Sequence, residues 1–429
     1  MADRVTVIGW DGSPLTSAAR SALSAATLVA GAAHHLALPG VPPAAERVRL
    51  GSVDLAARRI AGHRGTAVVL ADGDPGFFGV VRTLRAPEHG LEVEVVPAVS
   101  SVAAAFARAG MPWEDARIVV AHQRTLRRAV NVCRAHPKVA VLTSPGAGPA
   151  ELALLLEGVH RTFVICEELG TDRERVSVLT SDRAADHVWR DPNVVLVIGG
   201  VGGTGAGAPA APWLMGQDPA VRPVRGWGLP AEEYAPEEHG PEAYGPRGRG
   251  TTGAAPPIRP GAGEDPALRA AQLARLGPRV GDLVWDIGCA GGAFAVEAAR
   301  FGAAVIAVDT DPAACARTEA AARRHGVPLQ TVRGRAPHVL ENLPEPDVVR
   351  IAAGSVPVVT ACTDRRPERI VVHASTRDEA EAVGTALAAG GYTVESLLLQ
   401  TVGLDPDDWS ERERSVVFLL AGRRSDGAP

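Results

Sequence analysis

The residues best suited to bind a ligand in the first half of the chain form an acidic turn bracketed by glycines. An apolar run over residues 68–71 leads directly into the string Asp72-Gly73-Asp74-Pro75-Gly76-Phe77-Phe78-Gly79. Glycine permits sharp turns and proline stiffens them, so that backbone amides and carbonyls are exposed to a ligand. A tight turn that binds nothing is the alternative, and neighbouring segments must decide between the two interpretations.

Two further segments place small and polar residues after predicted strands. Residues 7–12 read Val-Ile-Gly-Trp-Asp-Gly, and residues 96–101 read Val-Pro-Ala-Val-Ser-Ser. Because the carboxyl ends of parallel strands meet at one edge of a sheet, we expect Gly9, Asp72 and Ser101 to lie near one another. The combination favours a ligand site over an empty turn.

A second glycine-rich turn follows a strand in the other half of the chain. Residues 284–292 read Val-Trp-Asp-Ile-Gly-Cys-Ala-Gly-Gly and precede a helix predicted over 293–300. The glycines depart from the G-x-G-x-x-G pattern, so a pyrophosphate is the weaker interpretation. About 20 residues later, Asp309 ends another strand, where its carboxylate can accept hydrogen bonds from a ribose diol. Together these residues predict a site for S-adenosylmethionine (SAM), the alternative being a structural turn.

The strands that must carry these turns differ between the two halves. Short β-branched runs alternate with helical periods in the first half, which predicts a repeated strand-helix unit with strands at 4–8, 67–70, 91–96, 117–120, 139–142, 162–165 and 193–198. Strand candidates in the second half lie at 282–285, 304–308, 330–332, 347–351, 369–373, 393–399 and 415–420. The last two are close enough to pair antiparallel, a pattern typical of a Rossmann-like methyltransferase domain.

Residues 201–263 separate the two halves. Of these 63 positions, 25 are Gly or Pro, and no helical or alternating apolar period is present. This composition predicts a linker that contributes no packed element. The expected organisation is therefore one domain over 1–200, the linker over 201–263, and a second domain over 264–429.

The composition excludes several classes of protein. With 46% hydrophobic and 22% charged residues, the chain is expected to fold, and its net charge of -5 gives no general attraction to nucleic acid or an anionic membrane. We expect no signal peptide and no membrane span, since no apolar run approaches about 18 residues. Lys138 is the single lysine, which excludes a Schiff-base lysine elsewhere. Five cysteines without a C-x-x-C pair predict no metal site and fit a reducing cytoplasm.

The motifs resemble those of two methyltransferase families. Residues 1–200 are similar to the tetrapyrrole methylases that act on precorrin-6 in cobalamin synthesis, through the first glycine loop, the Gly-Asp-Pro-x-Phe-x-Gly turn and the Val-Pro-x-x-Ser-Ser segment. Residues 264–429 are similar to the decarboxylating precorrin methyltransferases of the class I fold. The resemblance implies an α/β protein with an amino-terminal tetrapyrrole methylase fold of two αβα subdomains and a carboxy-terminal class I Rossmann-like domain.

The resemblance also implies a cofactor, a substrate and site residues. It implies two molecules of SAM, one in each domain. The residues that match the cofactor motifs are Gly9, Asp72, Gly73, Asp74, Phe77, Gly79 and Ser101 in the first domain and Asp286, Gly288, Gly292 and Asp309 in the second. The implied substrate is a polycarboxylate precorrin, methylated at carbons 5 and 15 with decarboxylation of its ring-C acetate. We expect a cytoplasmic homo-oligomer that binds neither nucleic acid nor membrane.

No catalytic acid or base is assigned, because an electron-rich enamine carbon needs positioning more than it needs a strong base. Arginines that could grip substrate carboxylates, although surface roles are expected for them, are Arg82, Arg124 and Arg335. Histidines for which structural roles are expected are His34, His35 and His122. Cys289 and Cys315 are expected to be packing residues rather than nucleophiles, since no histidine is near them in sequence.

Several positions depart from the families' patterns. Gly9-Trp10-Asp11-Gly12 stands where Gly-Pro-Gly is usual, and Gly334-Arg335-Ala336-Pro337 has arginine where an aspartate helps to hold adenine. Residues 351–355 lack a Gly-Gly turn, and residues 257–263 replace a segment containing Thr-Lys. One alternative is therefore a first domain that methylates alone beside a degenerate cofactor-binding or oligomerisation module. Another is a methyltransferase for ribosomal RNA or a protein side chain, against which the missing basic patch and the second domain argue.

Overall fold

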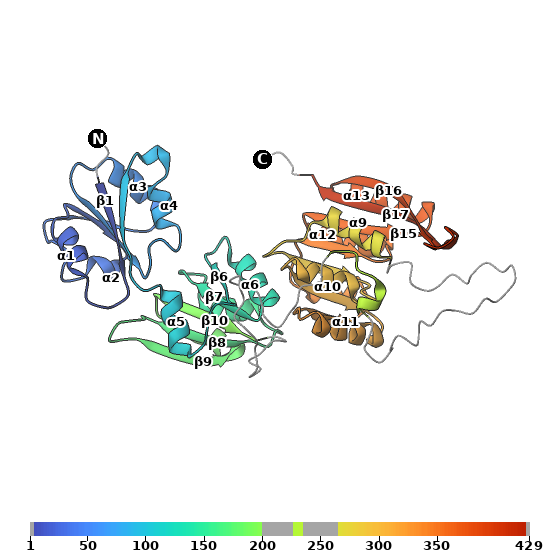
Figure 1. Ribbon diagram of the computed structural model, residues 1–429, viewed down its shortest axis with the longest axis horizontal. Helices are drawn as coiled ribbons and strands as arrows, with labels where there is room; N and C mark the ends of the chain where they lie inside the picture. Colours follow the sequence, from blue (N-terminus) through green and yellow to red (C-terminus); the bar gives the residue numbers. More distant parts are fainter. Residues whose placement is uncertain (1–3, 200–225, 235–264, 426–429) are drawn as a thin grey trace. The chain divides into compact units, whose positions relative to one another are not determined.

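A computed structural model describes residues 4–199, 226–234 and 265–425 of the chain (Figure 1). The described residues form two compact units, one in residues 4–123, 140–154 and 162–197 and the other in residues 124–139, 155–161, 198–199, 226–234 and 265–425. The predicted boundaries at residues 200 and 264 lie outside the described residues. Among the described residues, no helix is both long enough and apolar enough to cross a bilayer.

The first sheet carries the acidic turn. Its strands, in the order β3-β2-β4-β1-β5, pair in parallel throughout. They are β1 (Arg4–Trp10), β2 (Leu28–Gly31), β3 (Glu46–Arg49), β4 (Ala67–Asp72) and β5 (Glu92–Val96). The helices between them are α1 (Ser17–Ser24), α2 (Ala33–Leu36), α3 (Val53–Ala61), α4 (Val80–Leu84) and the 3-10 turn η1 (Pro87–His89). Strands β4 and β1 are neighbours at its centre, so their loops leave the sheet side by side.

The second sheet has the order β6-β7-β10-β8-β9, with β8 and β9 antiparallel. Its strands are β6 (Arg117–Val120), β7 (Lys138–Leu142), β8 (Thr162–Glu167), β9 (Arg175–Thr180) and β10 (Asn193–Ile198). The helices of this stretch are α5 (Ser101–Ala109), α6 (Leu126–Ala135), α7 (Pro149–Leu155) and α8 (Ser181–Ala185). The two sheets confirm the predicted amino-terminal fold.

Three strands of these sheets were not predicted, namely β2, β3 and β9. Strand β2 is a fully buried segment of four residues in which apolar and polar residues do not alternate, so its sequence cannot be told from that of a short buried helix. Strands β3 and β9 lie at the edges of their sheets and consist partly of exposed polar residues. Edge strands have one hydrogen-bonded neighbour and little buried surface, so their sequences carry a weak signal.

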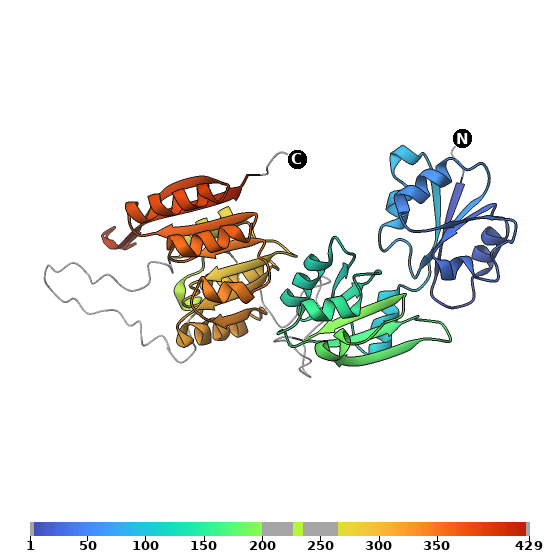
Figure 2. The ribbon, with the colours of Figure 1, turned by 180° about the vertical axis from the view of Figure 1, so that it is seen from behind.

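The third sheet confirms the Rossmann-like prediction, including its antiparallel end. Its order is β13-β12-β11-β14-β15-β17-β16, with β17 antiparallel to both neighbours. Figure 2 shows this unit from behind, with its carboxy-terminal elements in red. The strands are β11 (Leu283–Ile287), β12 (Ala304–Asp309), β13 (Gln330–Arg333), β14 (Val348–Ile351), β15 (Arg369–Ala374), β16 (Tyr392–Leu404) and β17 (Glu411–Arg424). The helices are α9 (Pro266–Leu276), α10 (Ala293–Arg300), α11 (Pro312–Arg324), α12 (Val356–Asp364), α13 (Arg377–Ala389) and the 3-10 turn η5 (His338–Asn342).

One short stretch of the predicted linker is packed, which makes the expectation of no packed element wrong for residues 226–234. This segment, called the strap below, includes the 3-10 turn η2 (Ala231–Tyr234). Leu229 and Tyr234 are buried in one cluster with apolar residues of α10 and α11. The strap packs on helices α10 and α11, which are distant in sequence, so the pattern of apolar residues within its own nine positions does not predict that it is packed.

A buried carboxylate anchors the strap. Glu297 of α10 is fully buried and accepts hydrogen bonds from Gly228 N (2.8 Å), Leu229 N (3.1 Å) and the Tyr234 hydroxyl (2.5 Å). Arg269 of α9 donates to the same carboxylate (2.9 Å) and also to the Leu229 carbonyl. Although burial favours the protonated acid, these donors hold the pKa of Glu297 below its ordinary value.

Candidate cofactor sites

The three amino-terminal loops converge through their backbones. Gly73 N donates to Trp10 O (2.7 Å), which joins the loop after β4 to the end of β1. A Cβ atom on Gly9 would lie 2.2 Å from Gly73 O and 2.8 Å from Ala98 N. A Cβ on Gly73 would lie 2.7 Å from Ser101 N. The loops after β1, β4 and β5 therefore touch at points where no side chain fits.

Asp74 shapes the acidic turn from within. Its Oδ1 accepts a hydrogen bond from Gly76 N (2.8 Å), and its carbonyl accepts one from Phe77 N (3.1 Å). Gly79, the residue that precedes helix α4, has φ of +69°, which favours glycine. The turn thus presents Phe77 and Phe78, whose rings meet edge to face at 4.9 Å.

A cavity of about 310 Å³ opens beside this turn. Four of the predicted residues line it, namely Asp72, Asp74, Phe77 and Ser101. Further lining residues, which were not predicted, include His35, Leu50, Val53, Phe78 and Val80. An apolar wall with a few converging polar groups is typical of a small-molecule site.

Asp11 holds the loop after β1, which lacks the usual Gly-Pro-Gly sequence, through hydrogen bonds. Its carboxylate accepts hydrogen bonds from Ser13 N (3.0 Å), from the Ser13 hydroxyl and from Val99 N (3.2 Å). Burial favours the protonated form, but these hydrogen bonds lower the pKa of Asp11. Gly12, with φ of +87°, approaches Gly170 so closely that a Cβ would lie 2.1 Å from its carbonyl oxygen. The departure from Gly-Pro-Gly therefore replaces a stiff turn with one held by a carboxylate.

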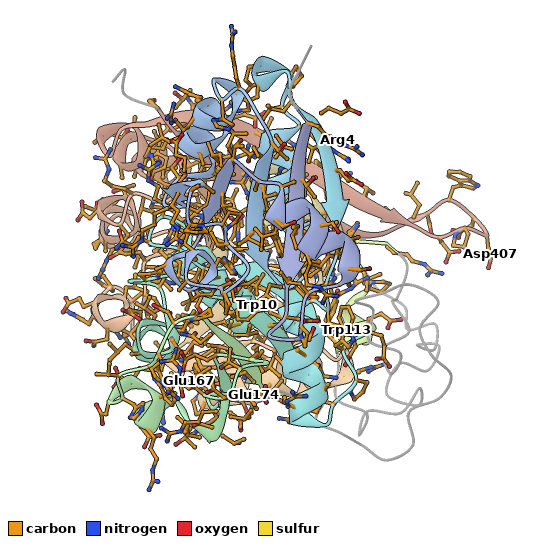
Figure 3. All side chains as sticks on the ribbon, turned by 90° about the vertical axis from the view of Figure 1, so that its left-hand side faces the viewer. Arg4, Trp10, Trp113, Glu167, Glu174 and Asp407 are labelled. Atoms are coloured by element: carbon orange, nitrogen blue, oxygen red, sulfur yellow. The ribbon has the colours of Figure 1, made fainter. Side chains whose placement is uncertain are left out.

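Two histidines flank Asp72, which sequence reasoning missed because strand β2, which precedes them, was not predicted. His34 Nε2 lies 2.9 Å and His35 Nε2 lies 3.0 Å from Asp72 Oδ1. Burial by itself would favour protonated Asp72, but the hydrogen bonds from both histidines hold its pKa well below the ordinary range. Trp10 packs beside both imidazoles, with ring centroids 6.1 Å and 5.9 Å away (Figure 3 labels Trp10).

The carboxy-terminal glycine turn also requires glycine at the predicted positions. Gly288 and Gly292 each have φ of +80°. A Cβ on Gly292 would lie 2.7 Å from the Cα of Thr318 on α11, and one on Gly288 would lie 2.9 Å from Ala352 Cβ. The turn therefore packs tightly against the middle of α11 and the end of β14.

Asp309 lies beside this turn, at the end of the neighbouring strand β12. Its Oδ2 accepts a hydrogen bond from Ala290 N (3.1 Å) and its Oδ1 accepts one from Asp311 N (3.0 Å). Each carboxylate oxygen keeps a second lone pair for a ligand. The sequence thus placed the pair of turn and carboxylate at one edge of the sheet, where the structure brings them together.

Asp286 differs from the other predicted residues, because it is sealed inside the protein. Its Oδ1 accepts a hydrogen bond (2.7 Å) from Arg350 Nη1, which also donates to Gly288 O (3.1 Å). Both side chains are at least 96% buried. Burial raises the pKa of Asp286 even though Arg350 opposes the rise. Arg350, which sequence reasoning missed, supports the turn from the adjacent strand β14.

The remaining candidates occupy less central positions. Gly334 N donates to Asp309 O (2.9 Å), which places the 334–337 turn next to Asp309, while the Arg335 side chain is exposed. Arg82 and Arg124 are exposed as well. Burial raises the pKa of the Cys289 thiol to about 12, which fits the expected packing role rather than a nucleophile.

The observed turns fit SAM by their shape and by their donors and acceptors. Each site combines backbone that no Cβ could approach with a carboxylate beside it, Asp72 in the first and Asp309 in the second. Close backbone approach suits a nucleoside and a carboxylate suits hydroxyl or ammonium donors. These residues would hold the cofactor.

Comparisons with known proteins place both halves in named families. The family of tetrapyrrole (corrin/porphyrin) methylases matches residues 10–185, and the precorrin methyltransferase domain matches residues 265–402. A cobalt-precorrin-7 C(5)-methyltransferase from Salmonella typhimurium is 36% identical over 173 residues, covering 38% of this chain and 82% of its own.

Two relatives span both halves. The precorrin-6Y C(5,15)-methyltransferase [decarboxylating] of Mycobacterium tuberculosis is 28% identical over 401 residues, which are 91% of this chain and 87% of the relative. The enzyme of the same name from Sinorhizobium sp is 31% identical over 337 residues, which are 77% of this chain and 69% of the relative. With both halves matched in tandem, the chain belongs to the family of decarboxylating precorrin-6Y C(5,15)-methyltransferases.

Proposed function

We propose that the chain binds two molecules of SAM, one at each glycine turn. The supporting observation is that both turns lie at the carboxyl ends of neighbouring parallel strands and need glycine for steric reasons. The proposed ligands are the predicted residues, with Asp286 acting through the loop that it supports rather than by contact. The predicted domain boundaries near 200 and 264 remain part of this proposal, with the difference that the strap within the predicted linker packs on helices of the second domain.

As a family member, the chain is a SAM-dependent methyltransferase that methylates precorrin-6Y at carbons 5 and 15 with decarboxylation, in cobalamin biosynthesis. SAM supplies the electrophilic methyl group. The protein's share is to hold the macrocycle carbon in line with that methyl and to exclude water, because alignment accounts for much of such catalysis. The reduced state of all five cysteines supports a cytoplasmic location.

The proposal also includes a homo-oligomer, for which the β16–β17 hairpin offers a surface. Both strands are long, and the side chains of Leu398, Leu404, Trp409 and Val416 are exposed on them or on the turn between them. Figure 3 shows Asp407 at the tip of this hairpin. A second copy is the proposed partner, since exposed apolar residues of this number favour association. Trp409→Asp should lower the mass measured by light scattering, and an unchanged mass would remove this surface from consideration.

Calorimetric titration with S-adenosylhomocysteine tests the two sites directly. We expect a stoichiometry near two, and loss of one site in Asp309→Ala. A single site that Asp309→Ala abolishes, and that persists in Asp74→Ala, would show that the first site is wrongly assigned. Mass spectrometry of the product tests the alternative of a degenerate second domain, which would add one methyl without decarboxylation.

A further inference from the structure

We propose that His34 accepts the proton released during methyl transfer in the amino-terminal domain, with Asp72 and His35 as positioning residues. This inference rests on the proposed function of that domain. The three side chains meet at the carboxyl end of β4, where Asp72 and His35 also line the 310 Å³ cavity.

The two histidines are not equivalent. His35 is 2% exposed, and its Nδ1 accepts a hydrogen bond from Ala32 N (3.2 Å). A neutral imidazole that accepts at Nδ1 carries its proton on Nε2, which faces Asp72. Nδ1 of His35 is therefore engaged with the backbone, and Nε2, 3.0 Å from Asp72 Oδ1, carries the proton rather than the lone pair that a metal ion would need.

In His34, only one of the two ring nitrogens is hydrogen-bonded to another described residue. Its Nε2 lies 2.9 Å from the Asp72 carboxylate, an acceptor, so Nε2 carries the proton and Nδ1 the lone pair. Nδ1 has no hydrogen-bond partner among the described residues, and the side chain is 32% exposed. An imidazole that is oriented by a carboxylate and open at its second nitrogen has the arrangement of a general base.

A charged group lies next to the proposed proton acceptor. The two imidazoles beside Asp72 Oδ1 hold the pKa of this carboxyl below its ordinary range, so that a carboxylate faces His34 Nε2 at 2.9 Å. Trp10, at the end of β1, packs beside the imidazoles, so the pair contacts residues at the carboxyl ends of both β1 and β4. The solvent-exposed edge of His34 allows the proton to pass on to water.

The reaction supplies a proton for such a base. As the new C–CH3 bond forms, the S–CH3 bond breaks and its electron pair stays on sulfur, giving neutral S-adenosylhomocysteine. The positive charge of the sulfonium passes to the methylated macrocycle. Loss of one proton from that macrocycle to His34 Nδ1 restores its charge, so no oxidant, reductant or further reactant is required.

The test uses the full chain with SAM and precorrin-6Y, counting transferred methyl groups by mass spectrometry. Gly9→Ala first identifies the step that belongs to the amino-terminal domain, because its Cβ would collide with Gly73 O. His34→Gln, which keeps a donor for Asp72 but loses the base, should slow that same step about 10²- to 10⁴-fold. Its affinity for S-adenosylhomocysteine should stay within twofold of the wild-type value.

Rescue separates a proton acceptor from a structural residue. In His34→Ala, added imidazole should restore part of the lost rate, whereas a packing defect would not respond. His63→Gln is the matched control, since His63 bonds Thr27 (2.9 Å) elsewhere in the same unit and should leave the rate unchanged. A wild-type rate in His34→Gln, or a slow His34→Ala without rescue, would overturn the inference. If Gly9→Ala loses no step, the proposed function of the domain fails instead.

Discussion

The two glycine turns solve the same steric problem in different ways. In the first site, the loops contact one another through their backbones. The side chain of Asp72 faces a cavity and is 43% exposed. In the second, the turn rests on a sealed ion pair between Asp286 and Arg350. A backbone contact depends on the absence of a Cβ, whereas a buried ion pair depends on both charges being present. The sites should therefore fail under different substitutions.

The largest difference should come from Arg350→Met. This change leaves the Asp286 carboxylate buried without its cation, which typically costs about 3–5 kcal/mol. We expect urea unfolding of the carboxy-terminal unit to shift by that amount while unfolding of the other unit is unchanged. Arg377→Met is the control, because its exposed partner Glu381 should contribute little. Equal effects of the two substitutions would remove the ion pair from its supporting role.

The same variant should respond to pH in a defined direction. Burial already raises the pKa of Asp286 in the folded protein, and removing Arg350 removes what opposes that rise. A carboxyl whose folded-state pKa exceeds its unfolded-state pKa binds protons more tightly when folded, so its contribution to stability is lost as pH rises through the folded-state pKa. The defect of Arg350→Met should therefore be smaller near pH 5 than near pH 8, as measured by unfolding at both values.

Glycine substitutions should separate the sites in binding. Gly9→Ala pushes a Cβ to within 2.2 Å of a carbonyl oxygen, and Gly292→Ala pushes one to within 2.7 Å of a Cα on α11. Each collision can be relieved only by moving the backbone of the turn or its neighbour, which displaces the groups that would hold the cofactor. Titration with S-adenosylhomocysteine should show each variant losing about tenfold or more in affinity, or about 1.4 kcal/mol, at its own site alone. Loss at both sites in either variant would mean that the two turns are coupled.

The two sites also differ in how many of their residues could be predicted from the sequence. Residues whose role depends on their own backbone, such as Gly73 and Gly292, were predictable because a turn after a strand is a local signal. Arg350 and His34 were not, since each acts through a partner 64 or 38 positions away in the chain. Asp286 was assigned to the cofactor by its place in a motif, and only its pairing across the sheet shows that it is sealed. The fold was predicted well because its central strands are buried apolar runs.

A smaller effect is expected where the strap meets the second site. The Tyr234 hydroxyl donates to Glu297 on α10, the helix that begins at the glycine turn. Tyr234→Phe removes one hydrogen bond to a charged group and should lower the free energy of unfolding by about 2 kcal/mol. Thermal unfolding of the full chain measures this, with Tyr392→Phe, whose hydroxyl bonds the Pro367 carbonyl, as the neutral-acceptor comparison. A larger loss in Tyr392→Phe would show that Glu297 is not the strap's main anchor.

The smallest effect is expected at Arg335, beside the second site. Its turn is bonded to Asp309 through Gly334, yet the guanidinium is exposed and cannot accept a hydrogen bond from an adenine amino group. We expect Arg335→Asp to supply that acceptor and to tighten the second site for SAM about tenfold, which is the value of one additional hydrogen bond. The first site provides the internal reference, since its affinity should not move. If Arg335 instead grips a substrate carboxylate, the same substitution will leave SAM affinity alone and weaken binding of the precorrin. No change in either affinity would mean that Arg335 contacts neither ligand and that both accounts of its role are mistaken.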